Sequence, residues 1–162
     1  MFIGNTGDFN GGAIGMTNSS SAGDTVYLSH NTFSNNTGKE AIHTCSWCTV
    51  HMTNTIIANS TGGINHTGGS SNKFYLTNTL FYNNTTDLTG SFINTNPLTG
   101  DPAFDSDGYH LTETSAAIDK GASTDLSTDI DGDVRVRGTA PDIGADESPY
   151  SAPVGLGIAI EK

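Results

Sequence analysis

The chain has 162 residues, of which 34% are hydrophobic and only 14% are charged, and its 17 acidic and 6 basic residues give a net charge of −11. The first 100 residues contain 15 asparagines and 18 threonines, and these residue types form helices poorly, so a helical bundle is excluded. The negative charge repels phosphate backbones and anionic lipid, and no apolar run reaches the roughly 18 residues of a membrane span. We therefore expect neither a nucleic-acid partner nor a membrane span.

Residues 1–100 repeat themselves at a period of 24 residues. Residues 26–36 align with 50–60 and with 74–84, and an incomplete earlier copy starts at Phe2 and Ile3. Short alternating strands at a fixed period of this length are typical of a β-solenoid, in which each repeat forms one coil. The sequence thus predicts an all-β fold with about 24 residues per coil. The incomplete first coil and the lack of a signal-peptide pattern suggest a piece of a longer chain, or a subunit whose open end a neighbour covers.

Alternation along each predicted strand assigns side chains to the two faces. The inward set consists of Val26, Leu28, Phe33, Val50, Met52, Ile57, Phe74, Leu76 and Phe81. Tyr27, His51 and Tyr75 share one outward position. Aromatic rows of this kind can contact sugars, which makes the three residues candidates for glycan contact. In the alternative, they simply favour strands and stack on one another.

Asn35, Asn59 and Asn83 recur directly after the second strand of each coil. Asparagine tolerates a left-handed turn and can bond its equivalents in neighbouring coils, so we expect a structural ladder at this corner. The same residues fall in Asn-x-Ser/Thr triplets, as do Asn18, Asn65 and Asn84. All six are potential glycosylation acceptors.

Cys45 and Cys48 form a Cys-x-x-Cys pair between His43 and His51. We expect a disulfide that closes a tight corner, which suits an oxidising compartment. Two alternatives remain open: the four side chains could bind zinc, or both thiols could be unpaired.

Residues 101–150 differ from the coils, because 13 of the 17 acidic residues lie beyond residue 100 and all 15 asparagines lie before it. Five motifs follow in order: Asp101-Pro102-Ala103-Phe104, Gly108-Tyr109-His110-Leu111, Ser115–Gly121, Asp129–Arg135 and Ala140–Glu147. Together they resemble the C-terminal segment of the choice-of-anchor Q family, although Ala116 stands where that family usually has proline. The resemblance implies a pectate-lyase-like right-handed parallel β-helix, an extracellular or cell-surface location, and no established catalytic activity.

An open end of a solenoid exposes backbone and apolar side chains, which natural solenoids cover. We expect residues 101–150 to form an acidic C-terminal cap on the last coil. The covering side chains would be Phe104, Leu111, Ile118, Ile130, Val134 and Ile143.

Asp129, Asp131 and Asp133 alternate as in the first half of a calcium loop. Ala140 stands where such a loop needs its final acid, so a distant acid such as Asp125, Asp142, Asp146 or Glu147 would have to complete a calcium site. In the alternative, Asp131 pairs with Arg135 and Asp133 caps a turn. No other cofactor is expected.

Catalysis within this chain is not expected. Lyases on β-helices use a Lys or Arg as base, and hydrolases use clustered carboxylates. Lys39 and Lys73 are out of register, and the few acids of the coils lie near turns.

Residues 151–162 form an apolar tail in which Val154, Leu156, Ile158 and Ile160 alternate with small residues. This strand could close its own cap, or it could add to the first coil of another subunit beside Phe2 and Ile3. The second arrangement joins different surfaces and propagates as a head-to-tail filament.

The sequence therefore favours an extracellular structural or adhesive β-solenoid whose partner is itself or a cell-surface polysaccharide. A polysaccharide-binding or polysaccharide-degrading module is one alternative. Ice binding is another, because Thr53, Thr55, Thr77 and Thr79 form outward rows.

Overall fold

The computed structural model describes residues 1–8, 11–16, 24–44, 48–67 and 73–152. These residues form strands and irregular segments and contain no helix, so the all-β prediction is confirmed. It follows that the described part of the chain has no helix long and apolar enough to cross a membrane. The strands are β1 (Phe2–Ile3), β2 (Thr6–Gly7), β3 (Ile14–Gly15), β4 (Asp24–Ser29), β5 (Thr32–Ser34), β6 (Thr37–Gly38), β7 (Glu40–Thr44), β8 (Cys48–Ala58), β9 (Gly62–His66), β10 (Phe74–Tyr82), β11 (Leu88–Gly90), β12 (Phe92–Thr95) and β13 (Leu98–Thr99).

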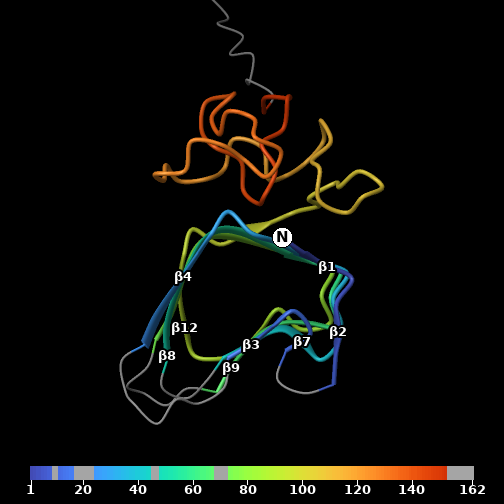
Figure 1. Ribbon diagram of the computed structural model, residues 1–162, viewed down its shortest axis with the longest axis vertical. Coiled ribbons are helices and arrows are strands. Elements are labelled where there is room, and N and C mark those ends of the chain that lie inside the picture. Colours follow the sequence, from blue (N-terminus) through green and yellow to red (C-terminus); the bar gives the residue numbers. More distant parts are fainter. Residues whose placement is uncertain (9–10, 17–23, 45–47, 68–72, 153–162) are drawn as a thin grey trace, which may run out of the picture.

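The strands build three sheets in which all pairings between these strands are parallel. The largest runs in the order β1-β5-β8-β10-β12, with β4 also on β8 and β13 also on β10. The others are β11-β9-β7-β3 and β2-β6. In Figure 1 the strands of successive repeats lie over one another around a common interior.

The pairing register reproduces the sequence repeat in the middle of the molecule. Val26 pairs with Val50 and Val50 pairs with Phe74, and both steps span 24 residues. The outer steps differ, because Phe2 pairs with Phe33 after 31 residues and Phe74 pairs with Phe92 after 18. The turns between strands take up these differences in length, so the apolar rows remain aligned.

The interior contains the apolar side chains that alternation assigned to it. Phe33, Val50, Met52, Ile57, Phe74, Leu76 and Phe81 are buried in one cluster, which confirms their prediction. Val26 and Leu28 are partly buried and pack against this cluster.

Left-handed residues divide the long strands β8 and β10 into two parts. Asn54 has a φ of 51° and Asn78 a φ of 48°. Before Asn54, strand β8 alternates between buried and half-buried residues, whereas every residue from Asn54 to Ala58 is buried. Ile57 faces the interior cluster, and Ile56 belongs to a second cluster on the opposite side of the sheet.

The C-terminal segment, residues 101–152, covers this second side. Its buried Leu111, Ala117, Ile118 and Ile143 pack with Ile56, Ala58 and Leu80, and Phe104 lies against the same cluster. Figure 1 shows the segment beyond one side of the strand body.

The expected position of the cap on the last coil was wrong. The segment bonds to several repeats along the outer side of the sheet: Ser34 Oγ donates to Gly108 O (2.8 Å), and Gly144 N donates to Asn54 O (3.0 Å). Ile130 and Val134 belong to neither apolar cluster and are 50% and 65% exposed. The reason is that the uninterrupted apolar runs at the ends of β8 and β10 need burial on both faces.

Candidate functional site

Side-chain carboxylates organise the C-terminal segment, which has only two isolated β-bridges, Phe104–Leu111 and Thr128–Val134. Asp119 Oδ1 accepts hydrogen bonds from the amides of Thr139 (2.6 Å) and Ala140 (3.1 Å), and Asp119 Oδ2 accepts one from Ala152 (2.7 Å). These bonds replace the backbone pairing that a sheet would supply.

Asp142 and Glu147 extend the same scheme into the interior of the segment. Asp142 accepts from the amides of Asp119 (2.7 Å) and Ser148 (2.8 Å). Glu147 accepts from the amides of Arg137 (3.0 Å) and Asp142 (2.9 Å). Burial raises the pKa of Asp142 to about 7, and burial also raises the pKa of Glu147.

Arg135 is the buried cation of this network and is only 4% exposed. Its guanidinium donates to the carbonyls of Gly144 (3.2 Å), Ala145 (2.9 Å) and Asp146 (3.4 Å). Burial lowers the pKa of Arg135, and the surrounding acids, Glu147 first, oppose that shift. The guanidinium thus fixes the chain direction at residues 144–146.

The three aspartates of the expected calcium loop do not converge. Asp129 Oδ1 accepts from the amides of Asp131 (2.9 Å) and Asp133 (2.8 Å), and Asp129 Oδ2 accepts from Glu147 N (2.9 Å). Burial alone would raise the pKa of Asp129, but these amide bonds lower it. Asp129 is therefore a turn-forming residue with both oxygens occupied.

The partners proposed for Asp131 and Asp133 in the alternative interpretation also differ. Asp133 forms an ion pair with Arg137 at 2.9 Å. Asp131 contacts His110, and its expected partner Arg135 is directed at backbone carbonyls.

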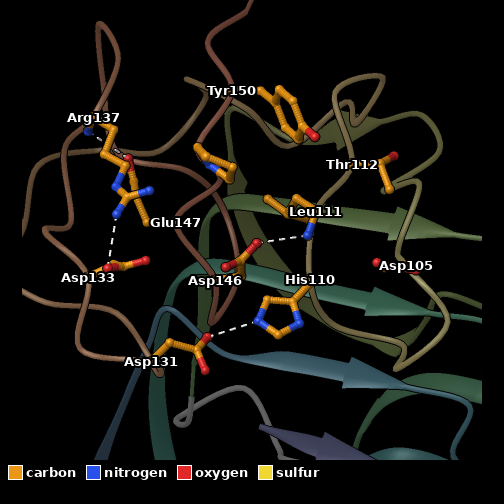
Figure 2. A pocket seen from close by; sticks show the side chains of 11 residues that line it. Asp105, His110, Leu111, Thr112, Asp131, Asp133, Arg137, Asp146, Glu147 and Tyr150 are labelled. Carbon is orange, nitrogen blue, oxygen red and sulfur yellow. Dashed lines mark hydrogen bonds and ion pairs between the residues drawn. The ribbon is translucent and has the colours of Figure 1, made fainter.

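A pocket of about 290 Å³ opens between the two halves of the segment and is lined by His110, Asp131 and Asp146 among others. Figure 2 shows the imidazole of His110 directed at Asp131, with Asp146 beside it. His110 Nε2 lies 3.1 Å from Asp131 Oδ2. One ligand atom from each of the three side chains lies within 4.8 Å of the other two, so nitrogen and oxygen donors converge here.

Asp107 contacts the His110 ring on the side opposite Asp131. The Asp107 carboxylate bonds to His110 Nδ1 and also accepts from the amides of Tyr109 (3.0 Å) and His110 (3.1 Å). The hydrogen bond to Asp107 raises the pKa of His110. This contact orients the ring so that Nε2 faces the pocket.

His110 and Asp107 were not predicted as site residues, and Asp146 was only one of four distant acids considered for completing a calcium site. The spacing of Asp107 and His110 is the one local signal, because residues three apart in a tight turn can meet. Asp146 lies 36 positions after His110, and no sequence periodicity links them.

The outward aromatic column forms a continuous stack. The ring centroids of Tyr27 and His51 are 5.1 Å apart, and those of His51 and Tyr75 are 4.6 Å apart, with interplanar angles of 16° and 7°. Both faces of His51 are thus covered by its neighbours. Tyr27 is 75% exposed and forms one end of this stack.

The predicted asparagine corner has the expected backbone conformation. Asn35, Asn59 and Asn83 have φ values of 55°, 52° and 50°. Asn83 Nδ2 donates to Asn59 Oδ1 at 2.9 Å, which makes one rung of the expected ladder.

A second left-handed corner, which the sequence analysis missed, lies at His30, Asn54, Asn78 and Asn96. Asn54 is fully buried; its side chain donates to His30 Nε2 (2.9 Å) and Ala122 O (2.7 Å) and accepts from Ala122 N (2.8 Å). Asn78 donates to Lys120 O at 2.9 Å. This corner joins the repeats to the C-terminal segment.

The remaining candidates divide between described and undescribed parts of the chain. Cys48 is disulfide-bonded, whereas Cys45 lies outside the described residues. Phe2 stacks on Phe33 with a centroid distance of 4.7 Å, and Ile3 pairs with Ser34. The tail residues Val154, Leu156, Ile158 and Ile160 also lie outside the described residues, as does Asn18.

No family model, no curated protein and no solved structure matches this chain.

Proposed function

We propose that the chain is an extracellular structural or adhesive β-solenoid: a right-handed parallel β-helix of the choice-of-anchor Q type with a C-terminal segment bound to its side. The repeated 24-residue pairing step between β4, β8 and β10 supports the β-helix. The proposal rests chiefly on how the motif residues of the C-terminal segment are used. Asp119, Asp129, Asp142, Glu147 and Arg135 bind backbone groups of their own segment, so they build a fold and do not face a substrate.

An extracellular location fits two further features. Cys48 is disulfide-bonded, and disulfides persist in oxidising compartments. The many Asn-x-Ser/Thr triplets are compatible with the same location, because they are acceptors only in secreted proteins.

Self-assembly is the first route to a structural role. Strand β1 is at the edge of the largest described sheet and pairs on one side with β5. An edge strand of this kind can accept a strand from another molecule. We propose that residues 153–161 of a second copy supply it, beside Phe2 and Ile3.

Light scattering and negative-stain imaging of the full chain and of a chain ending at Ala152 test the assembly. We expect filaments or oligomers from the full chain and folded monomers from the shortened one. Equal masses for the two proteins would rule out assembly through the tail.

A panel of plant and bacterial polysaccharides tests the structural role itself. We expect no new reducing ends and no unsaturated uronate products after prolonged incubation. Either product, abolished by a single substitution in the chain, would replace the structural role with polysaccharide degradation.

Glycan binding is the second candidate function, and the exposed ring of Tyr27 favours it. A sugar can stack on such a ring at the end of the aromatic column. Saturable binding that Tyr27→Ala removes and Tyr75→Ala retains would establish this function. Equal effects of both substitutions would contradict it.

A further inference from the structure

The pocket of the C-terminal segment brings together one imidazole and two carboxylates from three separate turns. His110 follows the turn at residues 105–108, Asp131 lies in the turn that Asp129 organises, and Asp146 belongs to the stretch fixed by Arg135. Leu111 N donates to Asp146 Oδ2 at 2.7 Å, and this bond ties the first and third of these stretches together. The ligand atoms are therefore held by backbone contacts and not only by one another.

Asp146 provides an observation that is independent of the clustering. It is only 4% exposed, its Oδ2 accepts the bond from Leu111 N, and no described residue donates to its Oδ1, which leaves that oxygen free to bind a ligand. Asp146 lines the pocket that also contains His110 and Asp131.

Among the described residues, His110 alone pairs with the acids of the cluster. Asp107, Asp131 and Asp146 surround the imidazole, and among the described residues no Lys or Arg forms an ion pair with any of them. Arg137 pairs with Asp133, and Arg135 donates to carbonyls. A cation in the pocket would offset this negative charge.

We propose that His110 Nε2, Asp131 and Asp146 bind one divalent transition-metal ion, with Asp107 as the positioning residue behind His110. The bond from a carboxylate to the far nitrogen of a metal-binding histidine is the usual way in which such a ring is oriented. Two ligand atoms about 2.0 Å from a tetrahedral ion are roughly 3.3 Å apart, close to the 3.1 Å between His110 Nε2 and Asp131 Oδ2. The half-exposed Asp131 can move to close the remaining distance to Asp146.

The donor set selects the class of ion. Imidazole nitrogen suits zinc and other transition metals, whereas calcium takes oxygen ligands almost alone. One nitrogen and two carboxylates therefore favour Zn²⁺ or Mn²⁺ over Ca²⁺. This site differs from the Asp129–Asp133 calcium loop considered above. It uses His110 and contains neither Asp129 nor Asp133.

Isothermal titration of the full chain with Zn²⁺, Mn²⁺ and Ca²⁺ tests the proposal. We expect Zn²⁺ or Mn²⁺ to bind at one site and to raise the melting temperature, since an ion that binds the folded state stabilises it. Asp131→Asn and His110→Gln should each weaken that binding at least tenfold. Asp133→Asn is the matched control, because Asp133 lies two residues away, is exposed and is outside the cluster.

Three results would overturn the proposal. The first is an absence of binding by Zn²⁺ and Mn²⁺ at millimolar concentration. The second is equal loss of affinity in Asp131→Asn and Asp133→Asn, which would indicate a diffuse acidic surface or the calcium loop. The third is unchanged affinity in a His110→Gln variant that still unfolds at the wild-type temperature. This result would place the ion elsewhere.

Discussion

Asn54 connects the repeats to the C-terminal segment at a single left-handed position. Its buried side chain makes two bonds to the backbone of Ala122 and one to His30, while its carbonyl accepts from Gly144 N. Asn59 has nearly the same φ, but among the described residues its side chain bonds only to Asn83, near the surface. A comparison of the two asparagines therefore distinguishes the contribution of the left-handed backbone from the contribution of the buried hydrogen bonds.

Asn54→Gly should lower the free energy of unfolding by roughly 2 to 4 kcal/mol, because glycine keeps the left-handed backbone but leaves the polar groups of Ala122 buried and unsatisfied. The control Asn59→Gly should cost less than about 1 kcal/mol. Urea unfolding of both variants measures the difference. Equal costs would mean that backbone conformation alone makes Asn54 important.

His30 makes stability depend on pH. Burial, helped by the positive charge of Arg135, lowers the pKa of His30 from its ordinary value of 6.5 to about 4. Between these two values the unfolded chain takes up a proton that the folded chain does not. The free energy of unfolding contributed by His30 is therefore complete above pH 6.5 and is lost as the pH falls toward 4.

His30→Asn should abolish this loss, because asparagine fits the same left-handed position as Asn54 and Asn78 and does not titrate. The difference in the free energy of unfolding between wild type and variant should change by on the order of 3 kcal/mol from pH 7 to pH 4. Asp142 has a raised pKa and therefore stabilises the folded chain as the pH falls, which is the opposite of the effect of His30. Both proteins retain Asp142, so the difference between them reports on His30. Parallel stability profiles would contradict the assignment.

Recurrence in the sequence was sufficient to identify the corner at Asn35, Asn59 and Asn83, since the same residue type returned at the same place. It was not sufficient for the second corner, where His30 replaces asparagine in the first copy. The pocket was harder to predict. Asp131 was a candidate metal ligand, but its grouping with His110 and Asp146 depends on the tertiary path of irregular turns, which leaves no signal in the sequence.

The docking of the C-terminal segment on strands β5 and β8 depends on the close approach of Gly144. Gly144 has a φ of 108°, and a Cβ at this position would lie 2.8 Å from Ile56 Cδ1 and 2.9 Å from Thr32 Oγ1. Gly132 also has a positive φ, of 89°, but a Cβ there would meet nothing within 4 Å.

Gly132→Ala should therefore show the cost of backbone strain alone, about 1 to 2 kcal/mol. Gly144→Ala should cost about 1 to 3 kcal/mol more, because overpacking is added to the strain. Thermal unfolding of the two variants measures both terms. If Gly144→Ala were no worse than Gly132→Ala, the segment would not be packed tightly against the sheet.

Strand prediction succeeded where the 24-residue copies are complete, in β4, β8 and β10. It could not give the 18-residue step to β12 or the 31-residue step from β1, because turn lengths leave no periodic signal. The side-on position of the C-terminal segment was missed because only Ile57 and Phe81 were assigned a face in the apolar runs after Asn54 and Asn78, and their neighbours Ile56 and Leu80 were not considered. Such runs indicate a strand that is buried on both faces.

At the scale of the whole molecule, one sheet separates two apolar clusters. The interior cluster contains Ile57 and Phe81, and the outer cluster contains their neighbours Ile56 and Leu80 together with Leu111, Ile118 and Ile143. Because adjacent residues of the same strands pack into the two clusters, disruption of one cluster should also weaken the packing of the other. We therefore expect residues 1–100 and 101–152 to unfold as one cooperative unit.

Native-state hydrogen exchange tests this central claim most directly. The amides of Ala122, Ile143, Gly144 and Ala145 all bond within the segment or to the repeats. They should be protected to the same free energy as the strand amides of Val50 and Ile56. If the amides at 122 and 143–145 exchanged far faster while those of β8 remained protected, the C-terminal segment would be a separate, loosely attached unit, and the account of a single laterally covered solenoid would be contradicted.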